Sequence, residues 1–171
     1  MASLIVIPNP ILRQKAKEVN PTSVNLTHLV DEMSRIRQEN GGEGIAAPQL
    51  GESLRIINFM FRGREYTVFN PYIKNKKGAV QIVEGCLSIP DNIYSVKRPQ
   101  ALRLFGEDIH GNPIKLKADV YEAHPIEHEV DHLDGILIDK KGKLVGKKEV
   151  ILKPKLAFGG EDGKDLPRLR S

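Results

Sequence analysis

The chain has 171 residues, of which 40% are hydrophobic and 28% charged, and this composition indicates one globular domain rather than a disordered chain. The single cysteine excludes an intrachain disulfide, and no apolar run approaches the roughly 20 residues of a membrane-spanning helix. The net charge of +4 is unevenly spread, because residues 1–139 carry 16 Lys and Arg against 18 Asp and Glu, whereas residues 140–171 carry 10 against 4. We therefore expect a mildly acidic body and a basic C-terminal segment, and such a segment is more often a solvated tail than a nucleic-acid footprint.

Apolar periodicity and turn residues divide the body into short elements. The apolar run at 4–7, closed by Pro8, predicts a strand or an extended arm. Apolar residues at helical spacing from Leu26 to Ile36 predict a first helix that ends at the glycines after Asn40. A second helix is predicted near 119–134, and strands are predicted at 54–60, 66–69, 80–83, 101–105 and 114–117. This mixture predicts an α+β domain with mostly antiparallel pairing.

The strongest chemical signal is the sequence His-Glu-Val-Asp-His at residues 128–132, within the second predicted helix. Histidines four residues apart lie on one face of a helix, so His128 and His132 can bind one metal ion. Glu129 can then reach a water activated by that ion and act as a general base. The alternative is two surface histidines that happen to flank an acid. A catalytic metal site also needs a third protein ligand and an open position.

Cys86 is the candidate for that third ligand. A lone cysteine is usually an inert core residue, but this one follows Gly85 at the end of a predicted strand and is flanked by Glu84 and Ser88. A thiolate suits Zn²⁺ or Fe²⁺, and metal binding would itself remove the thiol proton.

A loop of small residues at 42–49, Gly-Glu-Gly-Ile-Ala-Ala-Pro-Gln, is the third feature. Its glycines and alanines permit close approach of other groups, and Gln49 can donate a hydrogen bond to a developing oxyanion. A phosphate-binding loop is a weaker interpretation, because no Lys-Ser/Thr pair follows and Pro48 interrupts any helix that would begin there.

Together, Gly-x-Gly-x-Ala-Ala-x-Gln, Glu-Gly-Cys-Leu-Ser and His-Glu-x-Asp-His resemble the motifs of the peptide deformylases, over roughly residues 8–139. This family removes the N-formyl group from the initiator methionine of new polypeptides and releases formate. The resemblance implies an α+β fold in which antiparallel sheets surround the helix that carries His-Glu-x-x-His. It also implies an N-formylmethionyl peptide as the substrate and a cytoplasmic, reducing location, with no membrane and no specific nucleic acid as partners.

The resemblance also implies roles for individual residues. It assigns the metal, natively Fe²⁺ and replaceable by Zn²⁺, Ni²⁺ or Co²⁺, to Cys86, His128 and His132. Glu129 matches the general base, which later protonates the leaving amine. The side chain of Gln49 and the backbone N–H of Leu87 match the donors to the oxyanion. The substrate lies extended and pairs with a strand edge, at positions that match Glu43, Gly44 and Gly85.

Some residues near the motifs set this chain apart from the family pattern. The residue before the first histidine is usually Gln in the family, but Glu127 stands here. A proline inside a helix costs about 3 kcal/mol, so we expect the second helix to begin near Pro125 or to be kinked there. If the segment is helical, His124 and Tyr121 border the metal face near the pocket for the methionine side chain, and the histidine would make that pocket more polar. The alternative is that His124 is an exposed residue. Around the ligands, Glu84 can accept from a histidine N–H. Arg98 is a candidate partner for Asp131 or Glu84, and the alternative is that Arg98 is a solvated surface residue.

The C-terminal part is predicted to be a basic tail over residues 158–171, after a catalytic domain over residues 1–157. Some bacterial members of the family use a long C-terminal helix to dock on the ribosome, but residues 150–155 here favour a strand or extended tail, so any ribosome contact is assigned to the basic segment. Two other hypotheses stay open at this point. One is a binding protein that holds peptide or RNA through its basic tail, and the other is a general peptidase, which would usually have His or Glu as the third ligand.

Overall fold

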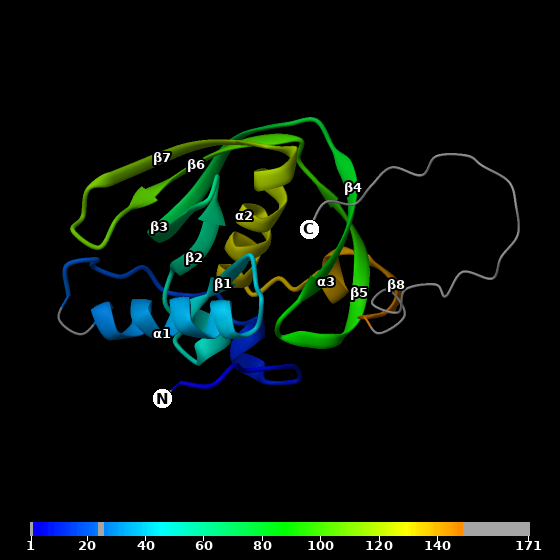
Figure 1. Ribbon diagram of the computed structural model, residues 1–171, viewed down its shortest axis with the longest axis horizontal. Helices are drawn as coiled ribbons and strands as arrows, with labels where there is room; N and C mark the ends of the chain where they lie inside the picture. Colours follow the sequence, from blue (N-terminus) through cyan, green and yellow to red (C-terminus); the bar gives the residue numbers. More distant parts are fainter. Residues whose placement is uncertain (1, 24–25, 149–171) are drawn as a thin grey trace, which may run out of the picture.

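Helix α2 lies between two antiparallel sheets in this computed structural model, which describes residues 2–23 and 26–148 (Figure 1). One sheet has five strands in the order β1-β2-β3-β6-β7, and the other has three in the order β4-β5-β8. In chain order the elements are η1 (Pro10–Arg13), α1 (Leu26–Glu39), β1 (Gly44–Ala46), η2 (Ala47–Leu50), β2 (Ile56–Phe61), β3 (Arg64–Lys77), β4 (Val80–Cys86), β5 (Ile89–Arg98), β6 (Ala101–Glu107), β7 (Pro113–Asp119), α2 (Val120–Leu133), α3 (Ile138–Lys141) and β8 (Lys143–Lys147). The predicted α+β class with antiparallel pairing is confirmed.

The predicted strands correspond to β2, β3, β4, β6 and β7, but three strands were not predicted. Strand β1 is short and consists of small residues, and β5 contains Pro90, Asp91 and Asn92, which are typical of turns. Strand β3 is much longer than predicted, because it continues past Asn70 and Pro71 through a shift in its pairing with β6. Asn70 has a left-handed φ of 48°, which belongs to this irregularity.

One face of α2 forms the main hydrophobic core with the five-stranded sheet. Ala123, Ile126, Val130 and Leu133 are all buried there, as their helical spacing predicts. They pack in one cluster with apolar residues of the sheet, including Phe59, Val68, Leu102 and Leu104. The helix that carries the two histidines is therefore held in place by the sheet from Ala123 to Leu133.

Helix α2 begins at Val120, close to the range 119–134 predicted from its apolar spacing. The alternative start near Pro125 is wrong, because Pro125 lies in the interior of the helix. Its first turn is capped by Glu122, whose carboxylate accepts a hydrogen bond from the Asp119 N–H at 3.1 Å. The proline leaves the Tyr121 carbonyl without its helical donor. Tyr121 is 86% exposed, so water can take that place.

The N-terminal residues form an extended arm rather than a strand. The Ile5 N–H donates to the Gln49 carbonyl at 2.7 Å, and the Ile7 N–H donates to the Ser88 carbonyl at 3.0 Å. The arm therefore ties the loop before β2 to the turn after β4.

Two further expectations concern membrane-spanning helices and the C-terminal part of the chain. Within residues 2–23 and 26–148, none of the helices has the length and apolar content that a bilayer crossing requires. The boundary predicted at residue 157, the basic tail and the strand predicted at 150–152 all lie outside the described residues.

Candidate active site

Three buried side chains gather where strand β4 ends against helix α2. Cys86 is the last residue of β4, and His128 and His132 lie one turn apart on α2. One ligand atom of each lies within 4.8 Å of the other two, and Cys86 Sγ is 3.3 Å from His132 Nε2. A tetrahedral ion with Zn–S of about 2.3 Å and Zn–N of about 2.0 Å would hold such atoms roughly 3.5 Å apart. The three side chains therefore fit a divalent metal ion.

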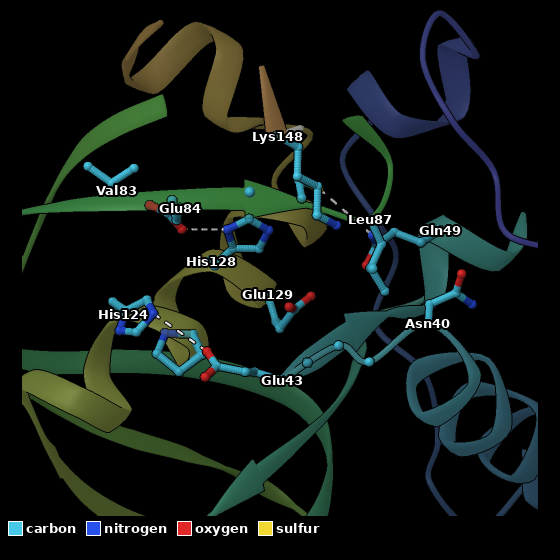
Figure 2. A pocket seen from close by; sticks show the side chains of 16 residues that line it. Asn40, Glu43, Gln49, Val83, Glu84, Leu87, His124, His128, Glu129 and Lys148 are labelled. Carbon is cyan, nitrogen blue, oxygen red and sulfur yellow. Dashed lines mark hydrogen bonds and ion pairs between the residues drawn. The ribbon is translucent and has the colours of Figure 1, made fainter. Parts of the chain in front are cut away.

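The second ring nitrogen of His128 is held by a buried ionic network. His128 Nδ1 lies 2.7 Å from Glu84 Oε2 (Figure 2), and Arg98 Nε donates to Glu84 Oε1 at 2.7 Å. The Arg98 side chain is fully buried, and it also bonds Glu127 at 3.1 Å and Asp131. The predicted contacts of Glu84 and Arg98 are thus present, and they fix which nitrogen of His128 turns toward Cys86.

Burial and charge shift the pKa values of these groups in different directions. Burial alone would raise the pKa of Glu84, but hydrogen bonds with His128 and Arg98 hold it below its usual range. Burial would lower the pKa of His128, but the bonds with Cys86 and Glu84 raise it well above its usual value. Burial and the charges of His128 and Arg98 lower the pKa of His132 well below its usual value. A lowered pKa favours the neutral imidazole of His132, which is the form that binds metals.

Glu129 points into the same space from the next position on α2 (Figure 2). It is 4% exposed, and within the described residues its Oε2 atom has no hydrogen-bond partner. Burial raises the pKa of Glu129 to about 7. A Cβ atom at Gly44 would lie 2.6 Å from Glu129 Oε1, so the glycine of β1 makes room for this carboxylate.

The amide of Gln49 is fixed by three neighbours. Its Oε1 atom accepts from the Ala46 N–H at 2.9 Å, and Nε2 donates to Ser88 Oγ at 3.1 Å and lies 4.0 Å from Cys86 Sγ. Ser88 Oγ donates onward to the Ile5 carbonyl at 2.7 Å, which adds the N-terminal arm to the support. The amide NH₂ group therefore faces the metal-binding cluster.

A cavity of about 380 Å³ opens over the cluster, and its lining includes Cys86, His128, Glu129, Gln49 and Leu87. Two edge strands border it, because β1 pairs only with β2 and β4 pairs only with β5 in the described sheets. Edge strands offer free N–H and C=O groups to an extended chain. The cavity thus combines a metal-binding corner with two edges that suit a peptide.

The comparisons with known proteins agree with this geometry. The family model described as polypeptide deformylase matches residues 1–147. The chain is 41% identical over 133 residues to a peptide deformylase of Dehalococcoides mccartyi, covering 77% of this chain and 80% of that protein. It is 37% identical to one of Pelotomaculum thermopropionicum, covering 84% and 93%.

The chain belongs to the polypeptide deformylase family. Such enzymes remove the N-formyl group from nascent polypeptides, and this chain has that activity. The crystal structure of the Thermotoga maritima peptide deformylase superposes with a TM-score of 0.80 at 29% identity, covering 84% of this chain and 98% of that one. The Synechococcus elongatus enzyme, solved in complex with actinonin, gives a TM-score of 0.79 at 32% identity, covering 83% and 79%.

The other predicted site residues of this deformylase are not all in the cavity. Glu43, Gly44, Gly85 and His124 line it, and His124 Nε2 lies 3.6 Å from Glu43 Oε2 (Figure 2). Burial lowers the pKa of His124. Tyr121 is not among the lining residues, and its side chain points to solvent. Since α2 begins at Val120, Tyr121 belongs to its exposed first turn rather than to the metal face.

Sequence reasoning singled out Glu127 but missed its partners, and it missed two residues that line the cavity. Glu127 is buried and binds Lys76 and Lys141 as well as Arg98. No periodicity or motif indicated these partners, because they come from β3, β5 and α3. Asn40 and Lys148 line the cavity from the end of α1 and from the residue after β8. Asn40 follows a predicted helix and Lys148 lies in the basic segment, so neither carried a local signal.

Proposed function

We propose that this deformylase hydrolyses the formyl amide of N-formylmethionyl peptides with Cys86, His128 and His132 as ligands of an Fe²⁺ ion. The single observation that carries the proposal is the buried Cys-His-His cluster beside an unpartnered carboxylate in one cavity. When bound, a divalent ion would polarise the formyl carbonyl and make water nucleophilic at neutral pH. Zn²⁺, Ni²⁺ or Co²⁺ suit the same donor set.

Glu129 is the general base in this proposal. Its free carboxylate oxygen faces the cavity, where it can take a proton from the attacking water. As the C–N bond of the formyl amide breaks, the same group returns the proton to the amine nitrogen. Water oxygen is then bonded to the formyl carbon, and the products are formate and a free amino terminus.

Gln49 and Leu87 stabilise the charge that develops on the formyl oxygen. The Gln49 amide is oriented toward the cluster by its bonds to Ala46 and Ser88. Leu87 follows Cys86 directly in the chain and lines the cavity, and its backbone N–H is the second donor in this proposal. Donors that are fixed before the reaction begins lower the barrier, and removing one costs about 2.7–4 kcal/mol in known cases.

The substrate binds as an extended strand between the edges of β1 and β4, near Gly44 and Gly85. The first side chain then lies near His124 and Glu43, a pair that makes this wall polar. We assign any ribosome contact to the basic segment after residue 139. The thiolate of Cys86 requires a reducing compartment, which favours the cytoplasm.

The test is formate release from formyl-Met-Ala-Ser by protein loaded anaerobically with Fe²⁺ and, separately, with Ni²⁺ or Zn²⁺. Glu129→Gln should retain one bound metal per chain and lose about 10²- to 10⁴-fold in kcat. Cys86→Ala should lose the metal itself. A Glu129→Gln protein that retains the wild-type rate would overturn the assignment of the general base. Equal rates with all ions would leave iron without support as the native metal.

A further inference from the structure

The outer face of the five-stranded sheet carries a group of cations and aromatic rings on three neighbouring strands. Two rows cross β3, β6 and β7. Tyr72 is paired with Phe105, which is paired with Lys115, and Lys74 is paired with Arg103, which is paired with Lys117. We call these six residues the basic sheet face.

The direction of these side chains follows from the alternation along each strand. The residues between the two rows, Ile73, Leu104 and Leu116, turn inward and pack in the core against α2. The basic sheet face therefore lies on the side of the sheet away from α2 and the active site (Figure 1). Its four cations are exposed, Tyr72 is 48% exposed and Phe105 is half-buried.

The two aromatic rings form an ordered platform for the cations. The Tyr72 and Phe105 rings stack with their centroids 5.3 Å apart and their planes inclined by 10°. Lys74 Nζ lies 5.3 Å from the Tyr72 centroid, and Lys115 Nζ lies 5.7 Å from the Phe105 centroid. A nucleobase can take the place of either lysine on a ring face while that lysine moves to a phosphate.

The charge of the basic sheet face is not neutralised within the described part of the chain. None of its four cations forms an ion pair with a described carboxylate, whereas Arg55, Arg62, Lys76 and Arg98 all do. Two carboxylates lie on the same face just outside the rows, because Glu107 is two residues after Phe105 on β6 and Asp119 is two residues after Lys117 on β7. Residues 1–139 together have a slightly negative net charge, but the basic sheet face is locally positive.

Protection of a sheet edge explains only part of this arrangement. Strand β7 is an edge strand, and lysines such as Lys115 and Lys117 prevent unwanted pairing at such an edge. Arg103, however, lies on β6 and is paired on both sides, with Lys74 of β3 and Lys117 of β7. Lys74 lies on the part of β3 beyond its pairing with β2, but edge protection does not call for the stacked rings of Tyr72 and Phe105 beside it. Cations interleaved with exposed aromatics are the pattern of surfaces that bind single-stranded nucleic acid.

We propose that the basic sheet face binds single-stranded RNA, without reading its sequence, on the side of the enzyme opposite the active site. The cations contact phosphates, and the rings stack on bases. The deformylase would then hold RNA and a formylated peptide at the same time, because the two surfaces lie on different sides of the sheet.

The first experiment compares two triple variants that remove the same charge. One is Lys74→Gln, Arg103→Gln, Lys117→Gln, and the other is Lys140→Gln, Lys143→Gln, Lys147→Gln in the basic C-terminal segment, whose three lysines are also exposed. Each is titrated with a labelled oligouridylate of about 12 nucleotides, a length within the usual site size, over a range of salt. Loss of three phosphate contacts should reduce the slope of log K against log salt by about 2 and weaken binding at least tenfold.

We expect that reduction for the sheet variant and little change for the C-terminal variant. An equal loss of oligouridylate affinity in both variants would indicate a general effect of net charge and would overturn the proposal. A loss of affinity in the C-terminal variant alone would place the RNA contact in the C-terminal segment instead. No binding by the wild-type protein at low salt would also overturn the proposal. Deformylation of formyl-Met-Ala-Ser by both variants, compared with wild type, confirms that they are folded.

The second experiment separates RNA from other polyanions. Tyr72→Ala should weaken oligouridylate binding about fivefold or more, since one stacked base contributes about 1–3 kcal/mol. The same variant should bind dextran sulfate, which has no bases, as the wild type does. If Tyr72→Ala weakened the binding of oligouridylate and of dextran sulfate equally, or changed the binding of neither, the nucleic-acid assignment would be contradicted. The basic sheet face would then be a surface for acidic partners in general.

Discussion

The two histidines of the proposed metal site lie one turn apart on α2 but are held in different ways. His128 Nδ1 is 2.7 Å from Glu84, which is itself held by the buried Arg98. His132 is 1% exposed, and its Nδ1 atom contacts no hydrogen-bonding group within the part of the chain that the structure describes. One ligand is therefore oriented by an ionic network and the other by the packing around it.

This difference shows where the site depends on charge. The network behind His128 contains three cations, Arg98, Lys76 and Lys141, and three carboxylates, Glu84, Glu127 and Asp131. It joins β3, β4, β5, α2 and α3, so it links both sheets to the helix that carries the ligands. Changes on the His128 side should alter metal affinity and stability through charge, whereas the His132 side should respond to packing.

The largest effect is expected for Arg98→Met. The substitution leaves Glu84, Glu127 and Asp131 without their shared cation in a buried place, and breaking a buried pair in this way costs about 3–5 kcal/mol. Urea unfolding of the two proteins measures the loss. The control is Arg35→Met, which breaks a surface group with Glu32 and Glu39 and should cost far less. Similar losses for both variants would mean that the network does not stabilise the fold through burial.

Glu84→Gln should weaken metal binding about 10- to 100-fold, because an amide is a poorer acceptor for the His128 N–H. A competition titration with a chelator of known affinity measures this change directly. Glu65→Gln is the matched control, since Glu65 pairs with Arg37 and does not contact a ligand. If Glu84→Gln binds the metal as tightly as the control does, packing alone would be enough to orient His128.

Glu127→Gln tests the outer part of the same network. The amide oxygen can still accept from Arg98, but Lys76 and Lys141 lose an anionic partner, so we expect a loss of about 1 kcal/mol in unfolding free energy. Among the described residues the Glu127 carboxylate pairs with Lys76, Arg98 and Lys141 and not with a histidine ring, so metal affinity should stay close to the wild-type value. A fall in affinity as large as that of Glu84→Gln would show that the whole network, rather than Glu84 alone, orients the ligand.

Much of the fold could be predicted where the pattern is local. The apolar spacing of Ala123, Ile126, Val130 and Leu133 indicated the buried face of α2, and five strands followed from apolar runs between turn residues. Strands β1, β5 and β8 were missed because pairing, rather than local propensity, makes them strands. The range of α2 followed from its apolar spacing, but the alternative start near Pro125 was wrong because it weighed the cost of the proline without the exposed turn and the capping Glu122 that precede it.

Some parts of the candidate site could be predicted from the sequence, and other parts could not. The cluster of Cys86, His128 and His132 followed from motifs, since helical spacing and a strand end carry that information. The contacts of Glu127 with Lys76 and Lys141 depend on tertiary packing between segments far apart in the chain, which no local pattern encodes. Tyr121 was expected near the metal face, but its place in the first turn of α2 depends on where that helix begins.

The smallest effect is expected for an ion pair outside the network, Arg13 with Asp139, which joins η1 to α3. The hydrogen bond from Arg13 holds the pKa of Asp139 below its usual value of 3.8. A carboxyl whose pKa is lower in the folded state stabilises the fold above its unfolded pKa, and this contribution disappears as pH falls through the folded value. Asp139→Asn should therefore cost about 0.5 kcal/mol at neutral pH, and its difference from wild type should shrink as the pH falls below about 3.8. Urea unfolding of both proteins at several pH values checks this, and a difference that grows on acidification would contradict the assigned direction of the shift.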